Sequence, residues 1–214
     1  VTATNETGFR IGPAVRGGGN GVVFSAALVD EKGNDVAPCA VKFLRRMDTR
    51  SRVDRFANEA RIMKSLGHDA IARFFGQGAV RDPQTGIDVP WLAMTLGGAN
   101  LREFVKGWEF SLAEFKTIAL DAIRAVEHVH EQQIIHRDIK PENFVVNDIN
   151  GSRRGMMIDF GIAKYIGEDV AHRPMDEFTQ HAEFIGPQFF SSPELIAYAR
   201  NKAQLVDHRS DLFQ

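Results

Sequence analysis

The chain has 214 residues, of which 43% are hydrophobic and 25% are charged, and its formal net charge is −2. These values describe an ordinary soluble globular protein, long enough for one sizeable domain or two small lobes. A net charge so close to zero gives no broad electrostatic reason to expect nucleic acid or a membrane surface as a partner.

Cysteine content and hydropathy favour a cytoplasmic setting. The single cysteine, Cys39, cannot form an internal disulfide, which favours a reducing compartment over secretion. No run of about 18 apolar residues is present, so no membrane-spanning helix is expected. The polar residues 1–7 are not typical of a signal peptide. The chain lacks an initiator methionine and stops inside a helical pattern at Gln214, so we expect a piece of a longer protein.

The first part of the chain is predicted to be mainly β-structure. Apolar runs bounded by turn residues predict strands, and these cover residues 9–15, 21–29, 39–44, 71–78 and 91–96. Between the third and fourth strands, apolar residues at helical spacing predict a helix over residues 52–66. The pattern therefore predicts a small antiparallel β lobe with one helix, formed by residues 1–96.

After Leu96 the pattern becomes mainly helical. Ser111 and Glu114 form a capping box that opens a long helix, predicted to run to about Gln132. Its apolar positions are expected to form one core-facing stripe: Phe115, Ile118, Ala122, Ile123, Val126 and Val129. Short strands follow at 144–147 and 156–158, joined by an Asn150-Gly151 turn. We expect an α+β protein whose second, mainly helical lobe, residues 97–214, is incomplete.

The most informative segment of this second lobe, residues 136–161, contains the two predicted short strands and the polar residues that precede and follow them. It places Asp138, Asn143 and Asp159 around one lysine, Lys140. Phosphoryl transfer requires positioning and charge neutralisation more than covalent chemistry. Asp138 is suited to accept the proton of an attacking hydroxyl, and Lys140 to hold the transferred phosphate. Asn143 and Asp159 offer the hard oxygen ligands that Mg²⁺ prefers.

The segment His136-Arg137-Asp138-Ile139-Lys140-Pro141-Glu142-Asn143, followed by Asp159-Phe160-Gly161, strongly resembles the catalytic and metal loops of eukaryotic-type protein kinases. This resemblance covers the chain from about Phe9 to its end. It implies a two-lobed protein-kinase-like fold that uses ATP and Mg²⁺ to phosphorylate protein substrates, with Asp138, Lys140 and Asn143 catalytic and Asn143 and Asp159 binding the metal.

A glycine-rich turn separates the first two predicted strands, in the stretch 16–23. Such a turn lets backbone N–H groups approach phosphates without obstruction by side chains, although glycine runs also form plain hairpin turns. Aligned on Gly21 and Val23, the stretch resembles the kinase glycine loop, with Gly18 as the middle glycine. Arg16 stands where the family usually has its first glycine, and neighbouring Gly17 can compensate.

A lysine in the third strand is the next matching position. Lys42 lies between apolar neighbours, so it needs a charged partner. Cys39-Ala40-Val41-Lys42 resembles the strand that carries the kinase phosphate-contacting lysine. The resemblance implies an internal ion pair between Lys42 and Glu59 of the helix; the alternative is two solvated surface charges.

The resemblance also implies an adenine pocket. Val23 and Ala40 would cover one face of the ring, and Val145 would form its floor. The stretch 91–98 resembles the strand and hinge that join the lobes. Met94 would guard the back of the pocket, while Thr95 and Gly97 would lend backbone groups to the adenine edge.

The segment 162–191 is expected to carry regulation and substrate choice. Arg137 can hold a negative charge there, supplied permanently by Glu183 or by phosphorylation of Thr179; the alternative for Glu183 is an ordinary solvated loop residue. Pro187 is typical of tyrosine kinases, whereas Lys140 is typical of serine/threonine kinases. The lysine touches the phosphate directly, so we predict serine/threonine specificity.

Two other functions remain as alternatives, a catalytically silent nucleotide-binding pseudokinase and a kinase-like enzyme that phosphorylates a small molecule. The intact set of polar residues argues against the first, and Lys140 with Ser192-Pro193-Glu194 favours a protein substrate. No P-loop motif is present, and Ile134 occupies the second histidine position of a zinc-protease helix. The resemblance further implies that Asp211 binds the backbone near His136.

Overall fold

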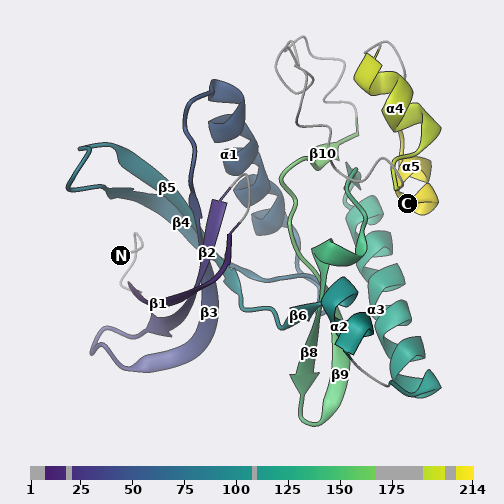
Figure 1. Ribbon diagram of the computed structural model, residues 1–214, viewed down its shortest axis with the longest axis horizontal. Helices are drawn as coiled ribbons and strands as arrows, with labels where there is room; N and C mark the ends of the chain where they lie inside the picture. The colour runs from purple at the N-terminus through teal and green to yellow at the C-terminus, as the bar shows by residue number, and fades with distance from the viewer. Residues whose placement is uncertain (1–7, 18–20, 108–109, 167–189, 201–205) are drawn as a thin grey trace. The chain divides into compact units, whose positions relative to one another are not determined.

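The computed structural model describes residues 8–17, 21–107, 110–166, 190–200 and 206–214 (Figure 1). The chain divides into two compact units. The first unit consists of Val1–Lys64 and Ala72–Gly97, and the second of Ser65–Ile71 and Gly98–Gln214. The short segment Ser65–Ile71 thus belongs to the second unit although it comes before residue 96 in the chain.

The first unit is built on a five-stranded sheet with the order β1-β2-β3-β5-β4. Every neighbouring pair is antiparallel, which confirms the expected small antiparallel sheet. The strands are β1 (Gly8–Gly17), β2 (Gly21–Val29), β3 (Asp35–Leu44), β4 (Phe74–Arg81) and β5 (Asp88–Thr95). The expected helix is α1 (Arg50–Ser65), which follows β3.

One face of this sheet carries an apolar core. Phe9 of β1 packs edge-on against Trp91 of β5, with ring centroids 5.4 Å apart, and Val41 of β3 is fully buried beside them. Gly78 in β4 makes room for the indole, because a Cβ there would lie 2.8 Å from the Trp91 ring. The strands are therefore held by side-chain packing as well as by their hydrogen bonds.

The second unit combines a three-stranded sheet, of order β6-β8-β9, with helices and a two-stranded β7–β10 pair. Its elements are β6 (Ala99–Asn100), α2 (Leu101–Gly107), α3 (Leu112–Glu131), β7 (Ile134–Ile135), η1 (Pro141–Asn143), β8 (Phe144–Ile149), β9 (Ser152–Met157), β10 (Lys164–Tyr165), α4 (Pro193–Arg200) and α5 (Arg209–Phe213). In the described part of the chain, no helix combines the length and the apolarity needed to cross a bilayer.

The α3 helix begins as predicted, with Ser111 and Glu114 forming both hydrogen bonds of the capping box. The expected apolar stripe is wrong in part, because Phe115 and Ile123 are 54% and 63% exposed. The buried side of α3 instead includes Asp121, whose carboxylate binds Arg154 of β9. The stripe predicted from apolar residues alone therefore differs from the buried side of α3, which includes the charged Asp121.

The β8–β9 hairpin delivers the chain to the second half of the site. Asn150 and Gly151 have φ values of 54° and 77°, as expected for an Asn-Gly hairpin turn. At the far end of β9, the Met157 N–H donates to the Ala70 carbonyl at 2.8 Å. Asp159 follows two residues later. The strand that precedes it is therefore hydrogen-bonded both to β8 and to the Ala70 carbonyl.

Candidate active site

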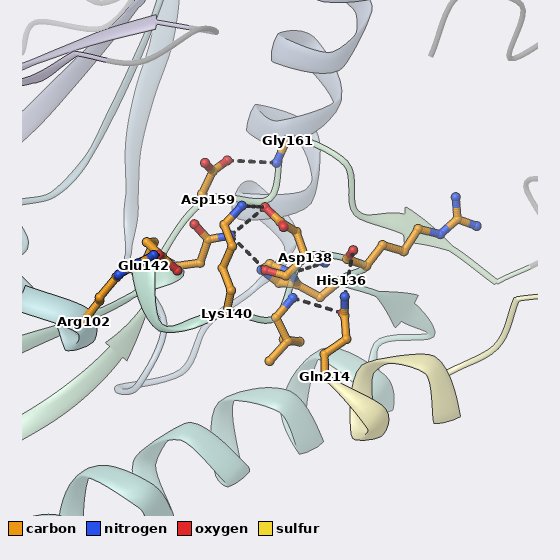
Figure 2. A network of polar contacts seen from close by, with 11 residues as sticks. Arg102, His136, Asp138, Lys140, Glu142, Asp159, Gly161 and Gln214 are labelled. Carbon is orange, nitrogen blue, oxygen red and sulfur yellow. Dashed lines mark hydrogen bonds and ion pairs between the residues drawn. The ribbon is translucent and has the colours of Figure 1, made fainter. Parts of the chain in front are cut away.

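The loop between β7 and η1 brings Asp138 and Lys140 together, as Figure 2 shows, and Asn143 at the end of η1 contacts the same carboxylate. Lys140 Nζ lies 2.5 Å from Asp138 Oδ2, and Asn143 Nδ2 donates to the same oxygen at 2.8 Å. Asn143 Nδ2 also donates to the Asp138 backbone carbonyl at 2.8 Å. The Asp138 side chain is 25% exposed, so its carboxylate is oriented by two donors and still open to solvent.

The hydrogen bonds of Asn143 determine which of its side-chain atoms is available. Both partners of Nδ2 are oxygen acceptors, which fixes the orientation of the amide. Among the described residues, no donor lies within hydrogen-bond distance of Oδ1. Asn143 as a residue is 5% exposed, and an amide carbonyl oxygen without a donor is suited to a hard cation.

Asp159 supplies the second oxygen-bearing group. It has a φ of 66°, in the left-handed region that residues other than glycine rarely adopt, and its Oδ1 accepts from the Gly161 N–H at 3.2 Å. The preceding residue, Ile158, donates its N–H to the Asn143 carbonyl at 2.8 Å. The backbones of the two predicted metal ligands are therefore joined almost directly.

These residues fit a Mg²⁺ ion that is bound mainly through a nucleotide. No group of three His, Cys, Asp or Glu suited to a metal occurs in the described part of the chain. Mg²⁺ in phosphoryl-transfer sites commonly takes one or two protein oxygens, and substrate phosphates and water complete its shell. The Asn143 amide oxygen and the Asp159 carboxylate match that smaller requirement.

The loop 136–140 is hydrogen-bonded to Asp211 of α5 and to Gln214, which follows α5. Asp211 accepts the backbone N–H groups of His136 at 2.8 Å and Arg137 at 2.7 Å, which confirms the expected contact. His130 Nε2 lies 2.9 Å from the same carboxylate. Gln214 Oε1 accepts the Ile139 N–H at 3.1 Å, a contact with no signal in the sequence.

His136 is a packing residue rather than an acid or base. Its ring lies 5.0 Å from that of Phe160, between centroids, and it is 1% exposed. Burial lowers the pKa of His136, and the charges of Asp211, Asp138 and Asp159 oppose this shift only in part. The imidazole is therefore neutral at physiological pH, and its Nδ1 accepts the Asp138 N–H at 3.3 Å.

The first unit contains the expected ion pair. Lys42 Nζ lies 2.7 and 2.8 Å from the two oxygens of Glu59, whose side chain is 3% exposed. Lys42 comes from the interior strand β3 and Glu59 from α1. Two buried opposite charges at this distance compensate one another's lost hydration, so the alternative of two solvated charges is excluded.

Register places the other predicted nucleotide residues of this unit on one face of the sheet. Val23 pairs with Lys42, and Ala40 pairs with Met94. Because Ala40 and Lys42 are two positions apart in one strand, all four side chains share a face. Gly21 begins β2, where a Cβ would lie 2.7 Å from the Phe43 carbonyl.

The remaining predicted nucleotide residues lie elsewhere in the two units. Thr95 ends β5, and its hydroxyl accepts the Arg73 N–H at 3.0 Å, away from the face that carries Met94. Gly97 ends the first unit. Val145 lies in β8 of the second unit and is 2% exposed. Gly18 lies outside the described residues, as do Thr179, Glu183 and Pro187.

A buried lysine–glutamate pair on a small antiparallel sheet, an Asp-Lys-Asn loop and an Asp-Phe-Gly turn are features typical of the protein kinase family. A family model described as "protein kinase domain" matches residues 11–213. The chain belongs to this family.

Three curated relatives illustrate the similarity. A probable serine/threonine-protein kinase of Corynebacterium efficiens is 34% identical over 212 residues, covering 96% of this chain and 29% of the relative. One of Streptomyces coelicolor is 34% identical over 210 residues, covering 96% and 28%. The serine/threonine-protein kinase PknJ of Mycobacterium tuberculosis is 27% identical over 209 residues, covering 96% and 32%. The chain thus spans about a third or less of these relatives.

Proposed function

We propose that this protein transfers the γ-phosphoryl group of ATP to a serine or threonine hydroxyl of protein substrates. The observation that supports this most directly is the convergence of Lys140 and Asn143 on the Asp138 carboxylate. The names of the relatives, which are serine/threonine-protein kinases, support the choice of acceptor. Lys140 also favours a serine or threonine acceptor, whereas Pro187 favours a tyrosine acceptor.

Each residue of the loop has a distinct part in this proposal. Asp138 accepts the proton of the attacking hydroxyl and orients its oxygen, as a positioned carboxylate does in general base catalysis. Lys140 provides positive charge beside the phosphoryl group during transfer. Asn143 and Asp159 would hold Mg²⁺, which neutralises phosphate charge when it is bound.

The first unit would serve as a nucleotide-binding lobe and the second as the catalytic lobe. Lys42, oriented by Glu59, would contact the α- and β-phosphates, and Gly18 and Gly21 would allow backbone approach to them. The adenine would contact the four sites predicted from the sequence: Val23 and Ala40, Met94, the backbone of Thr95 and Gly97, and Val145. The single cysteine supports a reducing, cytoplasmic compartment for the domain.

A labelling experiment tests the proposal against its two alternatives. The intact protein is incubated with radiolabelled ATP, Mg²⁺ and generic protein substrates, and Asp138→Ala is compared with the parent. We expect labelled protein from the parent and a loss of about 10²- to 10⁴-fold in the variant, because the general base is removed. Asp88→Asn, at an exposed position 62% accessible in its side chain, is the control for a lost carboxylate charge.

The outcomes separate the three functions. Nucleotide binding without labelled protein would favour a pseudokinase. Asp138-dependent ATP consumption without labelled protein would favour a small-molecule kinase. Labelled protein that is unaffected by Asp138→Ala would contradict the role of the loop. Labelled tyrosine in place of serine or threonine would overturn the choice of acceptor. A separate variant, Glu183→Ala, tests the predicted permanent negative charge: turnover should fall if Glu183 supplies that charge.

A further inference from the structure

Glu142 lies beside the metal-ligand candidate Asn143 and forms an ion pair with Arg102 of α2 (Figure 2). Arg102 Nη1 donates to Glu142 Oε1, linking two elements that are 40 positions apart in sequence. Neither residue has a part in the chemistry described above. The pair is nevertheless attached to the one turn that carries Asn143.

The short turn η1 influences the positions of both predicted metal ligands, Asn143 and Asp159. Its single 3₁₀ turn is closed by the Asn143 N–H, which donates to the Lys140 carbonyl at 2.9 Å. The Asn143 carbonyl then accepts the Ile158 N–H at 2.8 Å, one residue before Asp159. A shift of η1 would therefore move the Asn143 amide and also disturb the backbone that presents Asp159.

The α2 helix is a firm anchor for Arg102. Asn100 Oδ1 accepts the Glu103 N–H at 2.8 Å, and the Glu103 carboxylate accepts the Asn100 N–H at 3.3 Å. Phe104 is 5% exposed and packs with Ile118 and Val146. Because the helix start is capped and its core residue is buried, the base of the Arg102 side chain is held in place.

The charges explain why these two residues are paired. Glu142 Oε2 is buried and has no hydrogen-bond partner in the described part of the chain. Arg102 itself lies in the first turn of α2, where a cation is electrostatically disfavoured, so the helix gives it no stabilisation.

We propose that Arg102 is a positioning residue, whose ion pair with Glu142 holds η1 so that Asn143 keeps its amide oxygen available to a divalent cation. This inference rests on the proposed function, because it assigns the metal to Asn143. Residues that orient a metal ligand from outside its immediate shell typically change metal affinity or activity about 10- to 100-fold when they are replaced.

Four variants of the intact protein test the inference: Arg102→Ala, Arg102→Lys, Glu142→Arg and the charge-exchanged double variant Arg102→Glu/Glu142→Arg. Turnover is measured as a function of Mg²⁺ concentration, and melting temperature is measured with ADP alone and with ADP plus Mg²⁺. For Arg102→Ala we expect about a tenfold higher Mg²⁺ concentration at half-maximal turnover. We also expect loss of the extra stabilisation that Mg²⁺ adds to ADP, with the effect of ADP alone unchanged.

The other variants separate positioning from simple loss of stability. Arg102→Lys should recover most of the Mg²⁺ dependence, and the double variant should exceed Glu142→Arg in both measurements. Arg81→Ala removes the same charge from an exposed pair with Asp88, 3.5 Å apart, and should match the parent. Arg102→Ala that matches the parent within twofold would overturn the inference, as would a double variant no better than Glu142→Arg.

The two readouts also separate this inference from the proposed function. If the parent transfers phosphate and Arg102→Ala behaves like it, the inference fails and the function stands. If the parent transfers no phosphate but its Mg²⁺-dependent melting shift is lost in Arg102→Ala, the function fails and the inference stands. A parent that shows neither transfer nor a Mg²⁺-dependent shift contradicts both.

Discussion

Lys42 and Glu59 show how single residues in this protein carry charge into an apolar sheet. Their side chains are 10% and 3% exposed, and both carboxylate oxygens lie within 2.8 Å of the ammonium nitrogen. Removing hydration from either ion alone costs several kcal/mol, which a close opposite charge offsets. Each member of the pair therefore depends on the other.

Substitution of Lys42 tests this dependence. We expect Lys42→Met to lower the free energy of unfolding by about 3–5 kcal/mol, because it leaves the Glu59 carboxylate buried without its cation. The double variant Lys42→Met/Glu59→Leu should recover most of that loss, since it buries no charge. Urea unfolding followed by circular dichroism measures both. A double variant no more stable than Lys42→Met would show that the pair is not what sets the cost.

Two residues at the site adopt backbone angles that are unfavourable for side-chain-bearing residues. Arg137 has a φ of 68° and Asp159 a φ of 66°. Such conformations cost on the order of 1–3 kcal/mol each and persist only where surrounding contacts impose them. Asp211 binds the Arg137 N–H, and the Asn143 carbonyl binds the N–H that precedes Asp159. The strain therefore coincides with the hydrogen bonds that shape the loop.

At the scale of elements, α3 and β9 are joined by a buried carboxylate. Asp121 is 2% exposed, and its two oxygens accept Arg154 Nε and Nη2 at 2.8 Å and the Gly155 N–H at 3.0 Å. Burial acts to raise the pKa of Asp121, but these hydrogen bonds and the Arg154 charge outweigh it, so the pKa is lowered. Gly155 fits the same contact, because a Cβ there would lie 3.1 Å from the Ile118 carbonyl.

This link makes the stability of the second unit depend on pH. A carboxyl group whose pKa is lowered in the folded state contributes stability above its unfolded pKa and loses it on acidification. Asp121→Asn should therefore lower the free energy of unfolding by about 2 kcal/mol at neutral pH, since the remaining Arg154 is partly solvated. The difference from the parent should shrink below about pH 4. Equal stability at pH 7, measured by urea unfolding beside an Asp88→Asn control, would contradict this.

At the scale of the whole molecule, contacts between residues far apart in sequence complete the site. Asp211 of α5 binds backbone groups of His136 and Arg137, which lie 75 and 74 positions earlier. The same carboxylate lies 2.9 Å from His130 Nε2 at the end of α3. One buried side chain therefore connects α5, α3 and the catalytic loop.

Asp211→Ala should loosen this loop and reduce turnover by about 10²-fold, because small displacements of a reacting group cost large factors in rate. Asp211→Asn keeps one carbonyl acceptor and should lose less. Nucleotide binding should change little in both variants, since no predicted nucleotide contact touches Asp211. Turnover and a fluorescent-nucleotide titration, made on the same preparations, check these expectations. An Asp211→Ala variant with parental turnover would show that the loop holds its shape without α5.

Much of the fold could be predicted because its signals are local. Alternating apolar residues predict strands, Ser111 and Glu114 predict a helix start, and Asn150-Gly151 predicts a hairpin turn. All three features are present, and the family match covers residues 11–213. The candidate site could be predicted for the same reason, since Asp138, Lys140 and Asn143 lie within six consecutive positions.

The buried side of α3 and the support of η1 could not be predicted in this way. Asp121 is charged, so a hydropathy pattern assigns it to the surface, and only its contact with Arg154 explains its burial. Arg102 and Glu142 are ordinary charged residues in the sequence, and nothing local distinguishes them. Their importance depends on a contact between α2 and η1.

The sequence by itself determined the order of the elements, the motif residues of the loop 136–143 and the family of the chain, because periodicity, turn residues and motifs are written in neighbouring positions. The tertiary structure decided which buried charges meet, which side of α3 is covered and which residues hold the loop in its strained shape. The physical reason is range: hydrogen bonds and ion pairs act over about 3 Å in space, whereas the partners here are separated by tens of positions along the chain.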